Sequence, residues 1–256
     1  MSDSPARFVW HELMTTDVES AKAFYAKVIG WSMQLFSDGS DYTVLSVGTK
    51  GVGGIMSIPP DACARGAPAC WQGYIGVDDV DVCASRIHST GGAIIKPAQH
   101  IPGVGRFAVV ADPQGAVFII FRPQGTDSSS ALAPDTPGLI GWNELHAVDG
   151  LKAFSWYADV FGWTKVQDID MGDMGPYRLF ATGAGPVGGM MTKTPEMPQP
   201  FWACYFNVES IDAAIARTIQ AGGKLLHGPQ EVPGPAYIAN CQDPQGAWFS
   251  MVAQRR

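Results

Sequence analysis

Two glutamates stand in matching short motifs that could carry acid–base chemistry. Glu12 follows Trp10 by two residues, and Glu144 follows Trp142 by two residues. Both motifs are typical of β-strands, and side chains two apart on a strand share a face, so each carboxylate is predicted to lie beside an indole ring. Burial among apolar groups disfavours the charged form of a carboxylate and raises its pKa, which suits a general base or general acid.

A structural role fits the same two glutamates. In that alternative each carboxylate holds the backbone or pairs with a buried arginine. The two motifs also differ, because Met14 shares a face with Glu12 whereas His146 shares a face with Glu144. One half of the chain could therefore be active while the other serves as a scaffold.

These motifs belong to a repeat that covers nearly the whole chain of 256 residues. The paired segments are, in order, 10–13 and 142–145, Phe24-Tyr25 and Trp156-Tyr157, Gly30-Trp31 and Gly162-Trp163, Gly91-Gly92 and Gly222-Gly223, and 112–116 and 243–247. A duplication of this length predicts two similar domains. We place them at residues 1–122 and 139–256, joined by a linker rich in Ser, Pro and Gly at residues 123–138.

Within each half, the hydrophobic pattern predicts two modules of one strand, one helix and further strands. In the first module a helix is expected to begin after Thr16 or Asp17, either of which can cap it, and to end at Gly30. The second module has a predicted helix that begins near Asp79 and ends at Gly91-Gly92. The strands predicted in the first half are residues 8–14, 42–47, 52–58, 71–77, 93–95, 106–111 and 116–121.

Composition excludes several classes of function. The net charge of −7 argues against nucleic acid, because binding to its phosphates needs a basic face. No apolar run approaches the roughly 18 residues of a membrane span, and the first residues lack the features of a signal peptide, so a cytoplasmic protein is expected. The five cysteines are odd in number and form no C-x-x-C, which indicates reduced thiols.

The order of elements and three motifs resemble the vicinal oxygen chelate superfamily, which includes glyoxalase I, bleomycin-resistance proteins, extradiol dioxygenases and two-domain glyoxalase-like proteins. The motifs are D-x₆-FY-x₄-GW from Asp17, V-D-D-V-D…GG from Val77, and G-R-F-A-V-V-A-D-P-Q-G-A-V-F from Gly105. The resemblance implies an α+β fold of two tandem glyoxalase-like half-open barrels, built from four βαβββ modules. In that family the inner face of each barrel holds the ligand.

Family enzymes hold a divalent metal on this face through His, Gln or Glu. The resemblance places the corresponding positions of this chain at Trp10, Trp142, Gln72, Ala203, Ile119 and Ser250. Of these residues only Gln72 is a plausible ligand. We therefore expect no cofactor and no standard metal site. An unusual divalent-metal site built from Glu144, His146 and Gln72 remains as the alternative.

Strand alternation, applied to the implied barrels, predicts which side chains line the ligand groove. Besides Glu12 and Glu144, the predicted groove residues are Trp10, Met14, Gln72, Tyr74, Arg106, Ile119, Trp142, His146, Tyr205, Tyr237, Trp248 and Ser250. Trp31 and Trp163, at the ends of helices, are expected in the core. The Gly53-Gly54 and Gly188-Gly189 pairs are expected where the sheet bulges or bends.

A groove with one carboxylate, several aromatic rings and a tyrosine hydroxyl suits a flat or amphipathic organic molecule. We therefore expect a glyoxalase/bleomycin-resistance-type protein whose partner is a small-molecule ligand, with neither nucleic acid nor membrane. A homodimer is compatible with this reading. The alternatives are a lyase, isomerase or dioxygenase that uses Glu12, Glu144 or an unusual metal site, and a role in protein–protein interaction.

Overall fold

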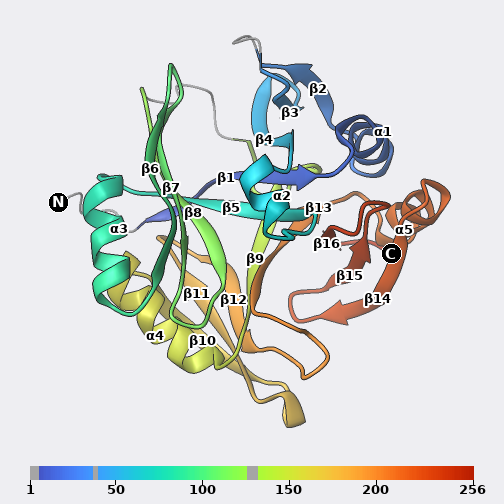
Figure 1. Cartoon of the computed structure of the whole chain (residues 1–256). Coiled ribbons are helices and arrows are strands. Elements are labelled where there is room, and N and C mark those ends of the chain that lie inside the picture. Colours follow the sequence, from blue (N-terminus) through green and yellow to red (C-terminus); the bar gives the residue numbers. More distant parts are fainter. Residues whose placement is uncertain (1–5, 37–39, 126–131) are drawn as a thin grey trace. The chain divides into compact units, whose positions relative to one another are not determined.

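The computed structural model describes residues 6–36, 40–125 and 132–256. The strands in these residues form two eight-stranded mixed sheets, one for each half of the sequence (Figure 1). Residues 126–131 of the predicted linker lie outside the described residues.

The first half contains two βαβββ modules. Its strands are β1 (Arg7–Thr15), β2 (Ser32–Leu35), β3 (Thr43–Val47), β4 (Lys50–Ser57), β5 (Cys70–Gly76), β6 (Ala93–Ile101), β7 (Gly105–Ala111) and β8 (Val117–Pro123). Its helices are α1 (Val18–Val28), α2 (Pro60–Ala64) and α3 (Val80–Ser89). The strand order is β2-β3-β4-β1-β5-β8-β7-β6, with β1 parallel to β4 and β5 parallel to β8.

The second half repeats this plan. Its strands are β9 (Ile140–Ala147), β10 (Thr164–Asp170), β11 (Pro176–Ala181), β12 (Pro186–Thr192), β13 (Phe201–Asn207), β14 (Lys224–Val232), β15 (Ala236–Gln242) and β16 (Trp248–Ala253). Its helices are α4 (Gly150–Phe161), α5 (Ile211–Gln220) and a short 3-10 helix at Gly172–Met174. The strand order, β10-β11-β12-β9-β13-β16-β15-β14, matches that of the first half. The predicted α+β fold of four modules is confirmed.

Local signals in the sequence account for the helix boundaries. The Asp17 carboxylate accepts a hydrogen bond from the backbone N–H of Ser20 over 3.0 Å and so caps α1, as predicted. Helix α4 ends at Gly162, whose φ of 74° is the left-handed conformation that glycine adopts most readily. Strand β6 continues to Ile101, beyond the predicted residues 93–95. Irregular pairing near Lys96 interrupts the alternation of side chains, so the sequence pattern predicted too short a strand.

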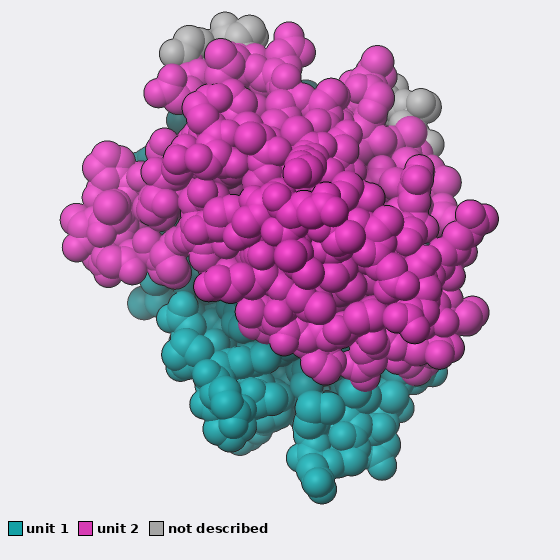
Figure 2. All heavy atoms as spheres, turned by 90° about the vertical axis from the view of Figure 1, so that its right-hand side faces the viewer, with its two compact units in different colours: residues 1–10, 72–128, 142–202 teal, residues 11–71, 129–141, 203–256 magenta. Residues whose placement is uncertain are grey.

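The most compact parts of the chain do not coincide with the sequence halves. One compact unit contains the described residues within 1–10, 72–128 and 142–202, and is called the β8–β9 unit below. The other contains those within 11–71, 129–141 and 203–256, and is called the β1–β16 unit (Figure 2). Each unit therefore takes one module from each half. The sheets follow the predicted halves, and the contiguous domains 1–122 and 139–256 stay a prediction.

Each unit has its own aromatic core. In the β1–β16 unit the Tyr25 ring packs edge-on against Trp71 and Phe249, with centroids 5.3 and 5.5 Å away. In the β8–β9 unit Tyr157 lies 5.3 Å from Trp202, also edge-on. The residues predicted to be core at the helix ends, Trp31 and Trp163, are buried, which confirms that prediction.

Two further observations bear on the expectations from composition. All five cysteines are free thiols, as predicted. Within the described part of the chain, no helix combines the length and the apolar character needed to cross a lipid bilayer.

Candidate functional site

The first strand of the second half presents the predicted acid–base residues on one face. Leu145 and Ala147 of β9 lie in the core of the β8–β9 unit. Because neighbouring residues of a strand point to opposite faces, Trp142, Glu144 and His146 lie on the face turned away from that core. These three side chains therefore share one face of β9, and their place in a ligand groove stays a prediction.

A chain of short hydrogen bonds connects three side chains on this face. The indole Nε1 of Trp142 donates to Tyr177 Oη over 2.7 Å. The Tyr177 hydroxyl in turn donates to Glu144 Oε2 over 2.6 Å. The second of these bonds is short for a hydrogen bond between two oxygens, so the Tyr177 hydroxyl holds the Glu144 carboxylate in one position.

The other carboxylate oxygen faces an imidazole. His146 Nε2 lies 2.9 Å from Glu144 Oε1, and both residues are at least 92% buried, with exposed fractions of 4% and 8%. The His146 ring stacks on Phe201 at a centroid distance of 4.9 Å and an interplanar angle of 22°. A carboxylate beside an imidazole can share a proton, and it can bind a hydroxyl or take a proton from a ligand.

Sequence reasoning missed Tyr177 as a member of this cluster. Gly189 on β12 is the Cα partner of Glu144, and a Cβ atom at Gly189 would overlap the Tyr177 ring. The missing side chain of Gly189 therefore makes room for the tyrosine that holds Glu144. Tyr177 and the Gly-Gly pair are both repeated in the first half, which is the signal that could have identified them.

The first half has an equivalent glutamate, glycine and tyrosine but no histidine beside them. Glu12 is 5% exposed, and its Cα partner on β4 is Gly54. A Cβ atom at Gly54 would overlap Tyr42, as at Gly189. Met14 stands where the second half has its histidine. The two halves therefore share the glutamate and the tyrosine, and His146 belongs to the second half alone.

Four other groove residues predicted in the first half lie on β1, β5 and β8. Gln72 and Tyr74 lie on the face of β5 opposite the buried Ile75, and Ile119 is the Cα partner of Tyr74 on β8. The Tyr74 ring also contacts Phe121 edge-on, at 5.8 Å. Trp10 is half-buried on β1.

In the β1–β16 unit, Tyr205, Trp248 and Ser250 lie on the faces of β13 and β16 turned away from the core. Their neighbours Phe206 and Phe249 point into it. Tyr205 and Ser250 are Cα partners on adjacent strands. That these three residues line a ligand groove stays a prediction.

Arg106 and Tyr237 do not line a groove. Arg106 has the strand parity of the core residues Ala108 and Val110, and its guanidinium makes two hydrogen bonds of 2.7 Å to Asp81 of α3. The guanidinium holds the pKa of the Asp81 carboxyl below its usual value. Tyr237 likewise packs against the core of its unit. Both positions lie on the helix-covered face, because they are an even number of residues from core positions of the same strand.

The donor set does not fit the metal site that the resemblance implies. The transferred positions carry two indoles, one carboxamide, a methyl group, an aliphatic chain and a hydroxyl. Within residues 6–36, 40–125 and 132–256, no group of three or more His, Cys, Asp or Glu side chains is placed so that it could hold a metal ion. The Glu144–His146 pair supplies only two such side chains.

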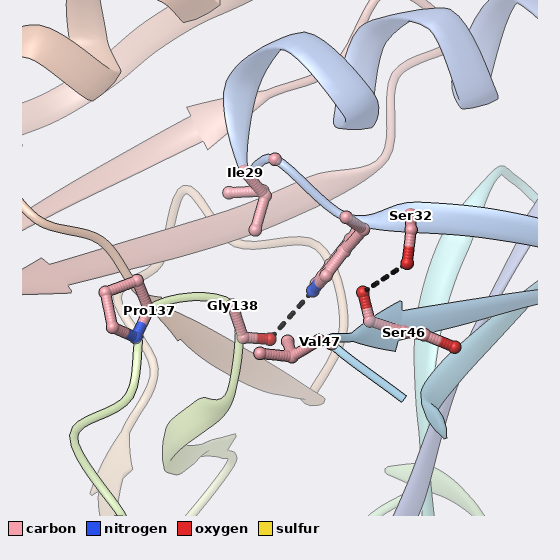
Figure 3. Close-up of a pocket in the computed structure, with 9 residues that line it drawn as sticks. Ile29, Ser32, Ser46, Val47, Pro137 and Gly138 are labelled. Carbon is pink, nitrogen blue, oxygen red and sulfur yellow. Dashed lines mark hydrogen bonds between the residues drawn. The ribbon is translucent and has the colours of Figure 1, made fainter. Parts of the chain in front are cut away.

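A pocket of about 370 Å³ lies elsewhere in the β1–β16 unit (Figure 3). It is lined by the end of α1, the strands β2 and β3 and the chain at Pro137 and Gly138. The Trp31 indole donates to the Gly138 carbonyl over 2.8 Å at this place. The lining carries no charged side chain, so the pocket lacks the groups for acid–base chemistry.

Two family descriptions match the sequence. Residues 140–251 match the Glyoxalase/Bleomycin resistance protein/Dioxygenase superfamily. Residues 7–48 match the family described as Bleomycin resistance protein-like N-terminal.

Full-length relatives and solved structures are similar to the chain. It is 33% identical over 250 residues to "Putative glyoxylase CFP32" of Mycobacterium bovis, across 95% of this chain and 93% of that protein. It is 30% identical to "Anthracycline biosynthesis protein DnrV" of Streptomyces peucetius, across 98% and 94%. The fold is similar to the Mn(II)-bound glyoxalase from Novosphingobium aromaticivorans (TM-score 0.66, 15% identity, 99% of this chain and 83% of that one). It is also similar to the 2,3-dioxygenase LapB from Pseudomonas sp. KL28 (TM-score 0.68, 14% identity, 98% and 93%).

Proposed function

Because this chain belongs to the glyoxalase/bleomycin resistance protein/dioxygenase superfamily, we propose that it binds a small, flat organic molecule at the Glu144–His146 pair. The observation that carries this proposal is the chain of contacts from Trp142 through Tyr177 to Glu144 and His146. It offers a fixed carboxylate and an imidazole beside aromatic rings. Such a surface suits a ligand that stacks on rings and presents a hydroxyl or carbonyl oxygen.

The ligand class follows from the same features. A ring system can stack beside Trp142 and Phe201, while a polar edge meets the Glu144–His146 pair. The relative named as an anthracycline biosynthesis protein supports this class, since anthracyclines are flat polycyclic aromatic ketones. We therefore propose an aromatic ketone or quinone that carries hydroxyl groups.

In this proposal the organic ligand binds without a metal ion at the standard site of the family. Of the transferred positions only Gln72 carries a plausible metal ligand, and the described residues contain no group of three or more His, Cys, Asp or Glu that could hold a metal ion. Elemental analysis of protein purified without a metal-binding tag tests this point. We expect less than about a tenth of an equivalent of any transition metal per chain, and near one equivalent would contradict it.

Titration with a soluble quinone, anthraquinone-2-sulfonate, tests the proposed site. We expect one binding event per chain, and about 10- to 100-fold weaker binding in Glu144→Gln, because hydrogen bonds to a charged group contribute about 1.5–3 kcal/mol. Glu12→Gln is the matched control: it removes the equivalent carboxylate of the first half and should leave the affinity unchanged. Equal affinity of wild type and Glu144→Gln would refute the site.

A second function is favoured by the 2.9 Å contact between His146 and Glu144. A carboxylate–imidazole pair can take a proton from the carbon beside a ketone and return it, which is isomerase or lyase chemistry. Exchange of that carbon-bound hydrogen for deuterium in D₂O distinguishes the two functions. Exchange that needs His146 and Glu144 would indicate an enzyme, and tight binding without exchange would indicate a sequestering protein.

A further inference from the structure

Little of the Glu144–His146 pair is accessible from solvent. The exposed fractions of the two residues are 8% and 4%. One face of the His146 imidazole is occupied by the Phe201 ring, which stacks on it at a centroid distance of 4.9 Å and an interplanar angle of 22°. Phe201 itself is only half-buried, so its ring is more accessible than the imidazole that it covers. A flat ligand can stack on this face of His146 only after the Phe201 ring has moved away.

The backbone around Phe201 is held on both sides. Before it, residues 193–200 connect β12 to β13 and contain three prolines, whose rings fix the backbone φ angle. Within this segment the Lys193 ammonium donates to the Met197 carbonyl over 2.6 Å. After it, Trp202 lies in the core of the β8–β9 unit. Rotation of the Phe201 side chain is therefore the simplest motion that uncovers the imidazole.

This rotation has two positions, closed on the imidazole and open. Side-chain rotations near the surface take picoseconds to nanoseconds, so the two positions exchange much faster than a ligand associates. An aromatic stack favours the closed position by a factor of about two to ten. A ligand that needs the open position is therefore bound more weakly by the same factor.

The stacked pair occurs in the second half alone. Met14 and Cys70 stand at the positions of the repeat that correspond to His146 and Phe201. A thiol has no ring with which to stack, yet the two sheets have the same strand order. The phenylalanine is therefore not a requirement of the fold, and it is present where the histidine is present.

We infer that Phe201 is a gate on the Glu144–His146 pair, and that a flat ligand takes the place of the Phe201 ring on the imidazole. The inference rests on the proposed function and adds how the ligand reaches that site. In the free protein the Phe201 ring covers the imidazole face. In the complex the ligand ring restores the stack, and the displaced Phe201 ring lies beside it, so binding exchanges one stack for another.

Rates of association and dissociation distinguish a gate from an ordinary contact. Stopped-flow fluorescence with anthraquinone-2-sulfonate measures both. We expect association to be about two- to tenfold faster with Phe201→Ala than with wild type, because no ring has to leave, and the dissociation rate to stay unchanged. A side chain that only contacts the bound ligand would give the reverse result, since the loss of a contact mainly raises the dissociation rate.

Chemical modification of His146 tests the gate without a ligand. Diethyl pyrocarbonate acylates an imidazole that it can reach, and mass spectrometry of peptides separates His146 from the other histidines. Modification of His146 should be about two- to tenfold faster in Phe201→Ala, because the open position is then permanent.

Two variants serve as controls for both measurements. Phe201→Tyr keeps a ring on the imidazole and should behave as wild type does. Cys70→Ala changes the equivalent position of the first half and should also leave the rates unchanged. Thermal melting shows that each variant is folded.

The outcomes separate the gate from the proposed function. Equal association rates of wild type and Phe201→Ala, or equal modification of His146 in the two proteins, would overturn the gate and leave the proposed binding site in place. Faster dissociation without faster association would also overturn it, because Phe201 would then be a contact of the bound ligand. If wild type does not bind anthraquinone-2-sulfonate, the proposed ligand class fails, and the exchange of stacks fails with it.

Discussion

The hydroxyl of Tyr25 donates a hydrogen bond to the Asp243 carboxylate over 3.1 Å, although the two residues lie 218 positions apart in the sequence. Tyr25 belongs to α1, and Asp243 begins the turn between β15 and β16. Trp71 donates its indole N–H to the same hydroxyl over 2.9 Å. The repeated motifs of one half are thus hydrogen-bonded to those of the other.

The second unit repeats this arrangement. Tyr157 donates to Asp112 over 3.3 Å, and Trp202 donates to Tyr157 over 3.0 Å. The Tyr of one half and the Asp of the other half meet in both units. The repeated Phe-Tyr or Trp-Tyr and Asp-Pro-Gln-Gly motifs therefore explain why each core needs both halves.

The two halves are expected to depend on each other for folding. Each compact unit takes its core from both, so residues 1–122 or 139–256 alone would expose a large apolar face. We expect either half alone to unfold without cooperativity or to self-associate, and the two halves expressed together to form a stable complex. Size-exclusion chromatography and thermal melting measure this. A monomeric half with a cooperative transition would contradict the prediction.

Removing one phenol should destabilise the unit that contains it. Tyr25→Phe leaves the Trp71 N–H and one oxygen of Asp243 buried without a partner, at a cost of about 1–3 kcal/mol in the free energy of unfolding. Tyr157→Phe is the matched variant in the other unit and should have a similar cost. Urea denaturation measures both. A change within about 0.5 kcal/mol in both variants would show that these hydrogen bonds contribute little to stability.

The buried turn aspartates should give stability a measurable pH dependence. Burial raises the pKa of Asp112 and Asp243 above the ordinary value of 3.8. Between 3.8 and the raised pKa the folded chain binds more protons than the unfolded chain. The contribution of these groups to the free energy of unfolding is therefore full below 3.8 and is lost as the pH rises through the folded pKa.

A double variant isolates this effect. In Asp112→Asn with Asp243→Asn neither group titrates, so wild-type stability minus variant stability should fall as the pH rises from about 3 to 7. Asp168, whose pKa is lowered by its hydrogen bonds with Arg178, gives the opposite slope in both proteins and cancels in the difference. Urea denaturation across this range provides the measurement. A flat difference curve would show that burial does not shift these two carboxyls.

Alternation along single strands was enough to predict part of the candidate site. The shared face of Trp142, Glu144 and His146 follows from the apolar residues between them, and the structure agrees. The same alternation predicts that Arg106 and Tyr237 lie on the helix-covered face and do not line a groove. Both are an even number of residues from core positions on their strands, and that information was in the sequence.

Other features could not be obtained from local patterns. Tyr177 lies on β11 and meets Glu144 only because β12 separates the two strands and carries Gly189 between them. The sequence pattern also did not predict that each core contains residues from both halves. An apolar face shows that Tyr25 is buried, but it does not show against which segment.

Gly189→Ala provides a test of the Tyr177–Glu144 contact that leaves both residues in place. The added methyl group would overlap the Tyr177 ring, and the backbone at Gly189 is not in the left-handed region, so the effect is purely steric. The ring must move, and Glu144 and Trp142 then lose their common partner. We expect a loss of about 1–3 kcal/mol in stability, together with weaker binding of anthraquinone-2-sulfonate.

Gly54→Ala is the control, because its methyl group would overlap Tyr42 in the first half in the same way. It should cost similar stability while leaving the affinity for the quinone unchanged, since the proposed site uses His146 and the first half has Met14 in its place. Urea denaturation and calorimetric titration of both variants separate the two effects. If Gly189→Ala bound the quinone as wild type does, Tyr177 would not be needed to hold Glu144 for the ligand. If both variants lost binding equally, the two halves would contribute alike, and the assignment of the site to the second half would fail.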